Sequence, residues 1–315
     1  MKQVKVLVIS DKYDFTTDFI SVELEKRNVS YLRLNRDEFH TYQIQIDSIN
    51  FSITISVGEL QYLISEGSLI SIYYRAPIFL RETFNEAIGI DEQLYREQWM
   101  SFVRNLLIFE KVTWVNNPQM TYKAENKILQ LKYAKMIGFE IPYTLITNTP
   151  PTSLNKKSYI VKSLDTAFFN VDGKEGFVYA NVLSKKEIQN SNLQLAPIII
   201  QDYISHKVDI RVTVVGQDVF ATSITINEKG VKNDWRKEKD NVVFKNITIP
   251  LEIENQCVKL VECLGLKFGA IDLLMTDEQK YYFLEINPTG EWAWLVHTTN
   301  QTIPTSIVNL LVAER

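Results

Sequence analysis

Glycine is scarce in this chain, and this restricts the folds that the chain can adopt. The 315 residues include 11 glycines, whereas an average composition of about 7% would give roughly 22. The sequence contains no G-x-G-x-x-G string and no G-x-x-x-x-G-K-[S/T] string. A Rossmann dinucleotide site and a P-loop both need glycines so that the backbone can approach a phosphate closely. Both sites are therefore excluded, and any phosphate that this protein handles must be bound by side chains.

Charge, cysteines and hydropathy narrow the class of protein further. The 34 basic and 38 acidic residues leave a net charge of −4, so we expect no nucleic-acid partner, which would favour a basic surface. Cys257 and Cys263 lie six positions apart in a predicted helix, where they suit neither a disulfide nor a metal pair. The apolar run before Asp11 is too short for a signal peptide, and no stretch approaches the roughly 18 apolar residues of a membrane span. We therefore expect a cytoplasmic protein with reduced thiols and no membrane partner.

Strands and helices alternate along the first part of the chain, which predicts an α/β unit. VKVLVIS and YLRLN are typical of strands, with helical spacing at residues 15–28 between them. Short strands are predicted within residues 42–64 and around residue 74, and an amphipathic helical segment at residues 82–110. The turn Val115-Asn116-Asn117-Pro118 ends this unit, because proline and paired asparagines stop both element types. A helix is then predicted from Gln119 to Ile137, ending at Gly138.

The sequence FGAIDLLMTDEQKYYFLEIN, residues 268–287, predicts two apolar strands joined by a polar turn. If the loop has an even number of residues, Asp272 lies opposite Phe283 and diagonal to Glu285. Strand alternation then puts Asp272, Glu285 and Asn287 on one face. Two carboxylates and an amide oxygen, with no histidine or cysteine nearby, suit Mg²⁺. The alternative is a surface hairpin whose polar residues face solvent.

Further charged residues lie upstream, each with an ordinary structural explanation. Lys162 lies in the apolar strand SYIVKSL, where an edge lysine is common. Lys127 lies on the helix after Pro118, where most lysines face solvent. Asp209 and Arg211 share one face of the strand KVDIRVTVVG and could pair with each other. The order of these residues along the chain is more informative than any one of them.

That order resembles the order of functional residues in the ATP-grasp ligases, which hold ATP between two α+β lobes and join a carboxylate to a nucleophile. The residues that carry the resemblance are Lys127, Lys162, Gln201-Asp202-Tyr203-Ile204, Asp209-Ile210-Arg211, Asp272 and Glu285-Ile286-Asn287. The segments NNPQMTYKAENKILQLKYAKMIGFEIPYTLITN and FLEINPTGEWAWL are, in addition, similar to the maturases of microviridin-type (graspetide, ω-ester-containing) peptides. The resemblance covers most of the chain, more loosely over residues 1–117.

The resemblance implies an ATP-grasp fold of α/β class, with α+β lobes. Residues 1–117 would form an N-terminal pre-ATP-grasp domain. Residues 118–203 would form a central lobe with a hairpin lid, and residues 204–315 a C-terminal lobe that carries the metal site. The family also implies a homodimer.

The resemblance implies a nucleotide site. Lys127 and Lys162 would neutralise the α- and β-phosphates of ATP, a task that suits compact point charges. The backbone of the hinge between the lobes would contact the adenine edge, and Asp209 would accept the ribose hydroxyls. The hinge residues are Gln201, Asp202, Tyr203 and Ile204.

It also implies a metal site and a catalytic arginine. Asp272, Glu285 and Asn287 match the Mg²⁺ ligands of the family, with Glu285 bridging two ions. Arg211 matches the arginine that contacts the γ-phosphate and the acyl-phosphate intermediate, where a planar fork of donors stabilises spread negative charge.

One segment departs from the usual ATP-grasp pattern. Many of these enzymes cover the phosphates with a glycine-rich loop after the second lysine, but residues 163–183 contain glycine only at positions 173 and 176. The segment predicts a β-hairpin with its turn at Asp172 to Gly176, similar to the maturase hairpin that takes part in holding the leader peptide. Candidate leader contacts are Phe168, Phe169, Phe177 and Tyr179. Packing within the lobe is the alternative.

The reaction that the resemblance implies is macrocyclisation of a ribosomally made precursor peptide. ATP would convert a Glu or Asp side chain to an acyl phosphate, and a Thr or Ser hydroxyl would attack it and form a macrolactone. Attack by lysine would give a lactam instead. Arg236, in the basic segment KNDWRKEKDN, and Arg75, at the end of the strand SIYYRAP, are candidates for contacting the acidic core peptide. A solvated charge run is the alternative for Arg236.

Two other functions stay open. A RimK-like ligase that adds a free amino acid to a carboxylate would use the same ATP residues with a different acceptor pocket. A nucleotide-binding regulator without turnover would not need the full set of metal and γ-phosphate residues.

Overall fold

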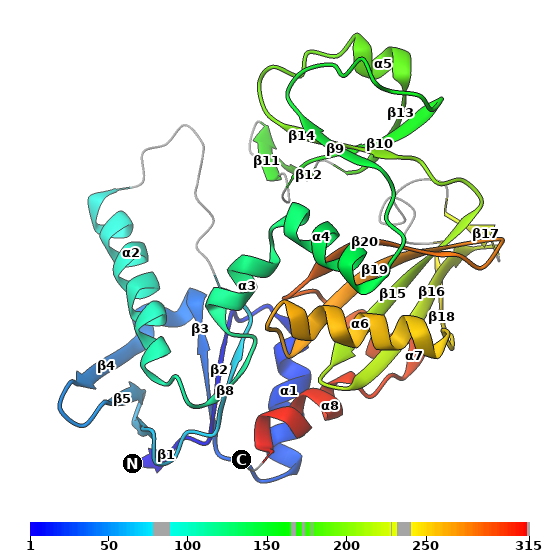
Figure 1. Ribbon diagram of the computed structural model, residues 1–315. Helices are drawn as coiled ribbons and strands as arrows, with labels where there is room; N and C mark the ends of the chain where they lie inside the picture. The colour runs from blue at the N-terminus through cyan, green and yellow to red at the C-terminus, as the bar shows by residue number, and fades with distance from the viewer. Residues whose placement is uncertain are drawn as a thin grey trace.

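The computed structural model describes residues 1–77, 89–164, 168–171, 174–177, 179–227, 229–231 and 241–313 (Figure 1). Helices and strands alternate along the chain, and the strands form separate sheets. Among the described residues, no helix is both long and apolar enough to cross a membrane. Cys257 is buried and Cys263 is exposed, and both are free thiols.

The N-terminal part of the chain contains two four-stranded sheets. The first is parallel, in the order β3-β2-β7-β8, and consists of β2 (Val6–Ser10), β3 (Tyr31–Asn35), β7 (Ser71–Tyr74) and β8 (Thr113–Val115). The second has the order β1-β6-β5-β4 and consists of β1 (Lys2–Gln3), β4 (Tyr42–Asp47), β5 (Ser52–Val57) and β6 (Leu60–Ile64). The run VLVIS of β2 is buried throughout, as expected for a parallel strand covered on both faces.

Helices cover both faces of the parallel sheet. On one face, β2 packs in a core with the second sheet and with α2 (Ile90–Asn105), which precedes the 3₁₀ turn η2 (Leu106–Ile108). On the other face, Val6 and Val8 pack against α1 (Phe15–Lys26). A second 3₁₀ turn, η1 (Arg36–Thr41), connects β3 to β4. The helical segment predicted at 82–110 thus begins at Ile90 in the described part of the chain, since residues 78–88 lie outside it.

The helix predicted over 119–137 is in fact two helices. α3 (Pro118–Ala124) begins with proline at its first position, and the Asn117 side chain caps it. Asn126 then starts a new helix, because its side-chain oxygen accepts the backbone N–H of Leu129 at 2.9 Å. The second helix, α4 (Lys127–Ile137), ends at Gly138, whose φ of 108° requires glycine. The break makes Lys127 the first residue of α4.

The central part of the chain forms an antiparallel sheet in the order β13-β10-β14-β9. Its elements are β9 (Thr144–Thr147), β10 (Ser158–Lys162), β13 (Asn181–Ser184), β14 (Ile198–Asp202) and α5 (Lys185–Gln189). The predicted hairpin lies beside this sheet as β11 (Phe168–Val171) and β12 (Lys174–Phe177), with Phe168 opposite Phe177 (Figure 1). The predicted turn at Asp172 to Gly176 is too long, because strand begins again at Lys174. Only Asp172 and Gly173 lie between the two strands, and an Asp-Gly pair is long enough for such a connection. These two residues lie outside the described part of the chain.

The C-terminal part forms a six-stranded antiparallel sheet. Five strands follow the order β17-β16-β15-β19-β20, and β18 pairs with β16. The elements are β15 (Lys207–Val215), β16 (Asp218–Ile226), β17 (Lys229–Gly230), β18 (Val243–Asn246), β19 (Phe268–Thr276), β20 (Tyr281–Asn287) and α6 (Leu251–Cys263). One face of the sheet packs on α4 and α6 in an apolar core that includes Val212, Ile271 and Phe283 (Figure 1). Polar positions on β15, β19 and β20 are therefore left for the opposite face.

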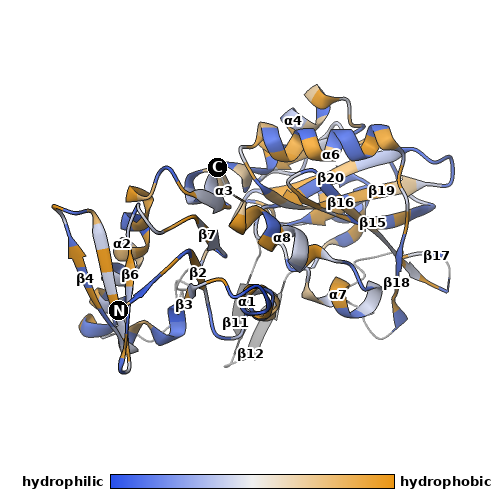
Figure 2. Ribbon diagram, turned by 90° about the horizontal axis from the view of Figure 1, so that it is seen from below, coloured by the Kyte–Doolittle hydropathy of each residue, from blue (hydrophilic) through white to orange (hydrophobic). Residues whose placement is uncertain are grey.

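Two last helices, α7 (Ala293–Thr299) and α8 (Ile303–Val312), connect this sheet to the N-terminal one. Val308 and Leu311 of α8 share a core with Val6 and Ile20 of the N-terminal part. Figure 2 shows α8, with hydrophobic residues along it, between α1 and the sheet that contains β15. The chain thus returns at its end to the parallel sheet, and the predicted domain limits at residues 117 and 203 stay a prediction.

Candidate functional site

The register of β19 and β20 brings the predicted metal ligands together, although not in the predicted way. The Thr276 backbone N–H bonds to the carbonyl of Lys280, so the connecting loop is residues 277–279, an odd number. Continued regularly, this register would put Glu285 opposite Ile271, on the apolar face. A bulge takes up Leu284, and Asp272 pairs directly with Glu285, while Phe283 pairs with Leu273 in the core. The predicted Asp272–Phe283 pair is therefore wrong, but Asp272 and Glu285 do share one face.

Arg211 belongs to the same face. It lies directly opposite Asp272 in the β15–β19 ladder, and its Nε is 3.2 Å from Oδ1 of Asp272. Arg211 is 7% exposed, and its Nε makes no hydrogen bond of standard geometry within the described structure. A guanidinium that is so deeply buried needs a carboxylate beside it. Asp209 forms an ion pair with Lys207.

Two lysines from different elements meet at Glu285. Lys127, at the start of α4, places Nζ 2.9 Å from Oε2 of Glu285. Lys162, at the end of β10 in the central sheet, places Nζ 4.0 Å from the same oxygen. Together with Arg211 and Asp272, they form a cluster of three cationic and two anionic side chains. The cationic side chains of such a cluster can bind an anionic ligand, and the carboxylates can bind a metal cation that accompanies the ligand.

The oxygen donors of the cluster fit Mg²⁺. Within the described residues, no group of three or more His, Cys, Asp or Glu side chains forms a metal cluster, so a third ligand has to come from another residue type. Asn287 lies at the end of β20, and its Oδ1 accepts the Thr289 N–H at 2.9 Å. The Thr289 hydroxyl also donates to this oxygen, at 3.3 Å, so a cation held by Asn287 would replace that longer bond. Mg²⁺ usually takes one or two carboxylates and keeps several waters, which this set allows.

The predicted hinge connects the central and C-terminal sheets. Gln201 is 3% exposed and donates through Nε2 to Thr144 Oγ1 at 2.8 Å. The Asp202 N–H bonds to the Tyr143 carbonyl at 2.9 Å. β14 ends at Asp202, and Tyr203 and Ile204 precede β15 without regular structure. The hinge strand is thus fixed on the central sheet up to Asp202.

The structure describes only part of the set of residues predicted to contact a peptide, and their role stays a prediction. Arg236 lies outside the described residues, and Tyr179 is half-buried after β12. In the β11–β12 backbone ladder, Phe168 is the register partner of Phe177, and Phe169 that of Gly176.

Arg75 is engaged by protein groups. Its Nε bonds to Asp14 at 2.8 Å, and its two terminal nitrogens bond to the Thr289 carbonyl at 2.9 Å and to Glu291 at 2.6 Å. Burial would raise the pKa of Asp14, but Arg75 and the hydrogen bonds of Thr16 and Thr17 outweigh burial and hold it below its usual value. A peptide carboxylate would have to replace one of these partners, and that role stays a prediction.

Sequence reasoning missed Asn116, which it took for a turn residue. The peptide bond before Asn116 is cis, and the side chain is 2% exposed. Nδ2 donates to the carbonyls of Phe268 and Pro288 at 2.8 and 2.7 Å, and Oδ1 accepts the N–H groups of Lys267 and Phe268 at 2.8 and 3.0 Å. Asn116 thus connects the end of β8 to the start of β19 and to the residue after Asn287. No pattern in the sequence indicates such a long-range partner.

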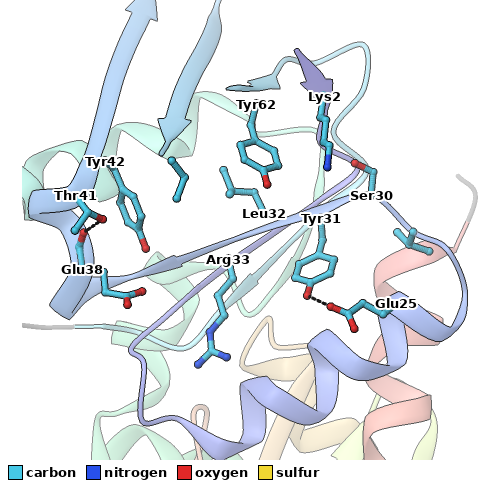
Figure 3. A pocket seen from close by; sticks show the side chains of 12 residues that line it. Lys2, Glu25, Ser30, Tyr31, Leu32, Arg33, Glu38, Thr41, Tyr42 and Tyr62 are labelled. Atoms are coloured by element: carbon cyan, nitrogen blue, oxygen red, sulfur yellow. Dashed lines mark hydrogen bonds between the residues drawn. The ribbon is translucent and has the colours of Figure 1, made fainter. Parts of the chain in front are cut away.

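A cavity of about 530 Å³ lies away from this cluster, beside β3 in the N-terminal part (Figure 3). Its lining includes the aromatic residues Tyr31, Tyr42 and Tyr62 and the charged residues Glu25 and Arg33. The charged groups are bound within the protein, because Tyr31 donates to Glu25 at 2.7 Å and Arg33 bonds to Asn35 at 2.8 Å. None of the predicted site residues lines this cavity.

Comparisons with known proteins identify the family of the chain and similar structures. The family described as RimK-like ATP-grasp domain matches residues 152–311. The structure of a RiPP-associated ATP-grasp ligase of Chryseobacterium gregarium, in complex with ADP and a leader and core peptide, is 27% identical, covers 100% of this chain and 98% of its own, and has a TM-score of 0.82. Macrocyclase MdnC of Microcystis aeruginosa, bound with precursor peptide MdnA, shares the fold at 22% identity, with 98% and 99% covered and a TM-score of 0.83. The α-aminoadipate–LysW ligase LysX of Sulfurisphaera tokodaii is 24% identical over 243 residues, 70% of this chain and 81% of LysX.

Proposed function

Because the chain belongs to the RimK-like ATP-grasp family and is an ATP-dependent carboxylate ligase, we propose that it closes rings in a ribosomally made precursor peptide. A Glu or Asp side chain of the peptide is the electrophile, and a Thr or Ser hydroxyl of the same peptide is the nucleophile. The similar ligase of Chryseobacterium gregarium, crystallised with ADP and a leader and core peptide, supports the choice of a peptide substrate.

One observation carries the proposal: lysines from two elements, α4 and β10, meet at the carboxylate of Glu285, beside the ion pair of the buried Arg211 with the half-buried Asp272. Phosphates that enter this cluster exchange Glu285 for phosphate oxygens as partners of Lys127 and Lys162. The hinge from Gln201 to Ile204 then contacts the adenine, and Asp209 the ribose. The ordinary alternatives, a solvent-facing hairpin and solvent-facing lysines, do not account for five charged groups at one place.

In this proposal, Mg²⁺ would be held by Asp272, Glu285 and Asn287, and two ions are expected. Bound Mg²⁺ supplies charge neutralisation for the phosphates during phosphoryl transfer. The protein side chains do the rest: Lys127 and Lys162 orient the phosphate chain, and Arg211 stabilises charge on the transferred group.

The reaction has two steps. A carboxylate oxygen of the peptide attacks the γ-phosphorus, the bond to the β-phosphate oxygen breaks, and ADP leaves. A hydroxyl oxygen then attacks the carbonyl carbon of the acyl phosphate, the ester bond forms, and inorganic phosphate leaves while the hydroxyl proton passes to solvent or phosphate. Each ring therefore removes one water from the peptide overall. An amine nucleophile follows the same steps and gives an amide.

The β11–β12 hairpin is the proposed contact of the leader peptide, through Phe168, Phe169, Phe177 and Tyr179. Its position beside the central sheet supports this role (Figure 1). Arg236 and Arg75 remain proposed contacts of the acidic core, and a homodimer the proposed assembly.

A second candidate is a ligase that joins an amino group to a carboxylate, favoured by the similarity to LysX. The two candidates share the nucleotide and metal residues and differ in the nucleophile. Mild base or hydroxylamine separates them, because esters open readily and amides do not.

The test combines the protein with ATP, Mg²⁺ and the peptide encoded by a neighbouring short reading frame rich in Thr and Glu or Asp, and follows the peptide mass. We expect successive losses of one water, abolished in Glu285→Ala and Arg211→Ala. Glu278→Ala is the matched control, because Glu278 is in the same hairpin, 75% exposed, and contacts Lys280. An unchanged peptide mass, together with ligation of free amino acids, would contradict the proposal.

A further inference from the structure

Gln130 is a buried polar residue on α4, one turn after Lys127. It is 1% exposed. Its Nε2 donates to the carbonyls of Ala124 and Ile286 at 2.6 and 2.9 Å, and its Oε1 accepts the N–H of Ile286 at 3.1 Å. Both amide protons and the oxygen are thus used by backbone groups.

The two hydrogen bonds from Gln130 to Ile286 take the place of those that a neighbouring strand would make. β20 is the last strand on its side of the sheet, in the order that ends β15-β19-β20. Backbone groups on such an edge lack ladder partners and need others when they are buried. Ile286 is buried, with 0% exposure. The Gln130 amide presents one donor and one acceptor side by side, as a neighbouring strand would.

Ile286 lies between two of the proposed Mg²⁺ ligands. Its N–H belongs to the peptide plane shared with Glu285, and its carbonyl to the plane shared with Asn287. Because Gln130 binds both the N–H and the carbonyl of Ile286, it fixes the backbone on either side, to which the side chains of Glu285 and Asn287 are attached. Lys127 adds a bond to the Glu285 carboxylate at 2.9 Å from the same helix face, three residues before Gln130. Before a nucleotide binds, α4 therefore holds both the backbone and the carboxylate of Glu285. When phosphates replace Glu285 as the partner of Lys127, the Gln130 bonds to the backbone remain.

We propose that Gln130 is a positioning residue that sets Glu285 and Asn287 for the Mg²⁺ of a bound nucleotide. This inference rests on the proposed function, because it takes the metal ligands from it. The bond to Ala124, the last residue of α3, fixes the Gln130 side chain itself. A side chain without the amide could fill the same space but could not hold the two peptide planes.

The test measures the affinity for the ATP analogue AMPPNP by calorimetry, once in EDTA and once with saturating Mg²⁺. We compare wild type with Gln130→Met, which keeps length and helix propensity, and with Gln189→Met, the same change at an exposed position of α5. In Gln130→Met, the affinity in EDTA stays at the wild-type value, and the gain from Mg²⁺ falls about tenfold, as for the loss of other groups that orient metal ligands. A merely structural role would lower the unfolding temperature without changing this gain.

The outcomes separate the two claims. If Gln130→Met keeps the full gain from Mg²⁺, the role of Gln130 is wrong, while the proposed function stands. If wild type binds no AMPPNP, the proposed function itself fails. Hydrogen exchange on wild type keeps the inference testable should Gln130→Met not fold: the Ile286 amide must exchange as slowly as the amides of the β15–β19 ladder, and fast exchange would overturn the inference.

Discussion

Replacing Asn116 by leucine should destabilise the protein by about 4 kcal/mol. The leucine has a similar volume but makes none of the four hydrogen bonds at 2.7–3.0 Å to Lys267, Phe268 and Pro288. At roughly 1 kcal/mol for each lost bond, the sum is about 4 kcal/mol. Since proteins have total stabilities of roughly 5–15 kcal/mol, this is a large fraction.

Equilibrium urea unfolding measures the effect, with Asn105→Leu as the matched control. Asn105 is exposed near the end of α2 and donates to the Ser101 carbonyl, so its replacement should change stability by less than about 0.5 kcal/mol. If Asn116→Leu is as stable as Asn105→Leu, the buried backbone groups around Asn116 find other partners, and the role of its side chain in connecting β8 to β19 is refuted.

Two further predictions concern charged groups. Arg75→Met should cost about 3 kcal/mol, because breaking a buried ion pair costs roughly 3–5 kcal/mol and the side chains of Arg75 and Asp14 are only 5% and 8% exposed. The folded-state pKa of Asp14 is lowered, so the ion pair stabilises the fold fully above the ordinary Asp pKa and less as the pH falls. The difference in stability between wild type and Arg75→Met, measured by urea unfolding, should therefore shrink below about pH 4. A difference that stays constant with pH would contradict this. Lys127→Met should weaken AMPPNP binding about tenfold, since a charge-assisted bond contributes roughly 1.5–3 kcal/mol. Lys132→Met, at an exposed position of the same helix, should leave binding unchanged, and equal affinities of the two variants would exclude a phosphate contact of Lys127.

The elements were predictable where one local signal dominates. The apolar run of β2 and the glycine after α4 indicate their structures directly, because burial on both faces and a positive φ each demand a residue type. The break between α3 and α4 carried a signal that was not used. Asn126 is a good capping residue, and it stands immediately before Lys127 in a segment otherwise read as one helix.

The register of β20 also carried a signal. Its buried residues Phe283 and Ile286 are three positions apart rather than two, and this spacing breaks the alternation of a regular strand. An extra residue, Leu284, is what a bulge inserts. Whether the loop has an odd or an even number of residues does not alone decide which residues pair. The three-residue loop shifts the register by one residue relative to an even loop, and the bulge shifts it by one more.

The partners of Arg75 and Gln130 could not be predicted from sequence. Arg75 bonds to residues 61 and 216 positions away, and Gln130 to a strand 156 positions away. Such bonds depend on how the sheets pack, which no local pattern encodes. The order of charged residues along the chain indicated a nucleotide site, but only the folded chain gives the side chains that orient its ligands.

Arg211 and Asp272 require a test that separates folding from chemistry. Loss of activity in Asp272→Leu would not identify a metal ligand, because Asp272 also compensates a guanidinium whose side chain is 8% exposed. Removal of one partner of a buried pair costs roughly 3–5 kcal/mol, whereas an apolar replacement of both is often neutral.

The double variant Arg211→Met/Asp272→Leu should therefore recover stability to within about 1 kcal/mol of wild type, as measured by urea unfolding. Ring formation should stay lost in the double variant, because it lacks both the proposed γ-phosphate contact and a proposed Mg²⁺ ligand. If the double variant regains ring formation together with stability, then Arg211 and Asp272 act only as a structural pair, and the chemistry assigned to this face of the sheet belongs to other residues.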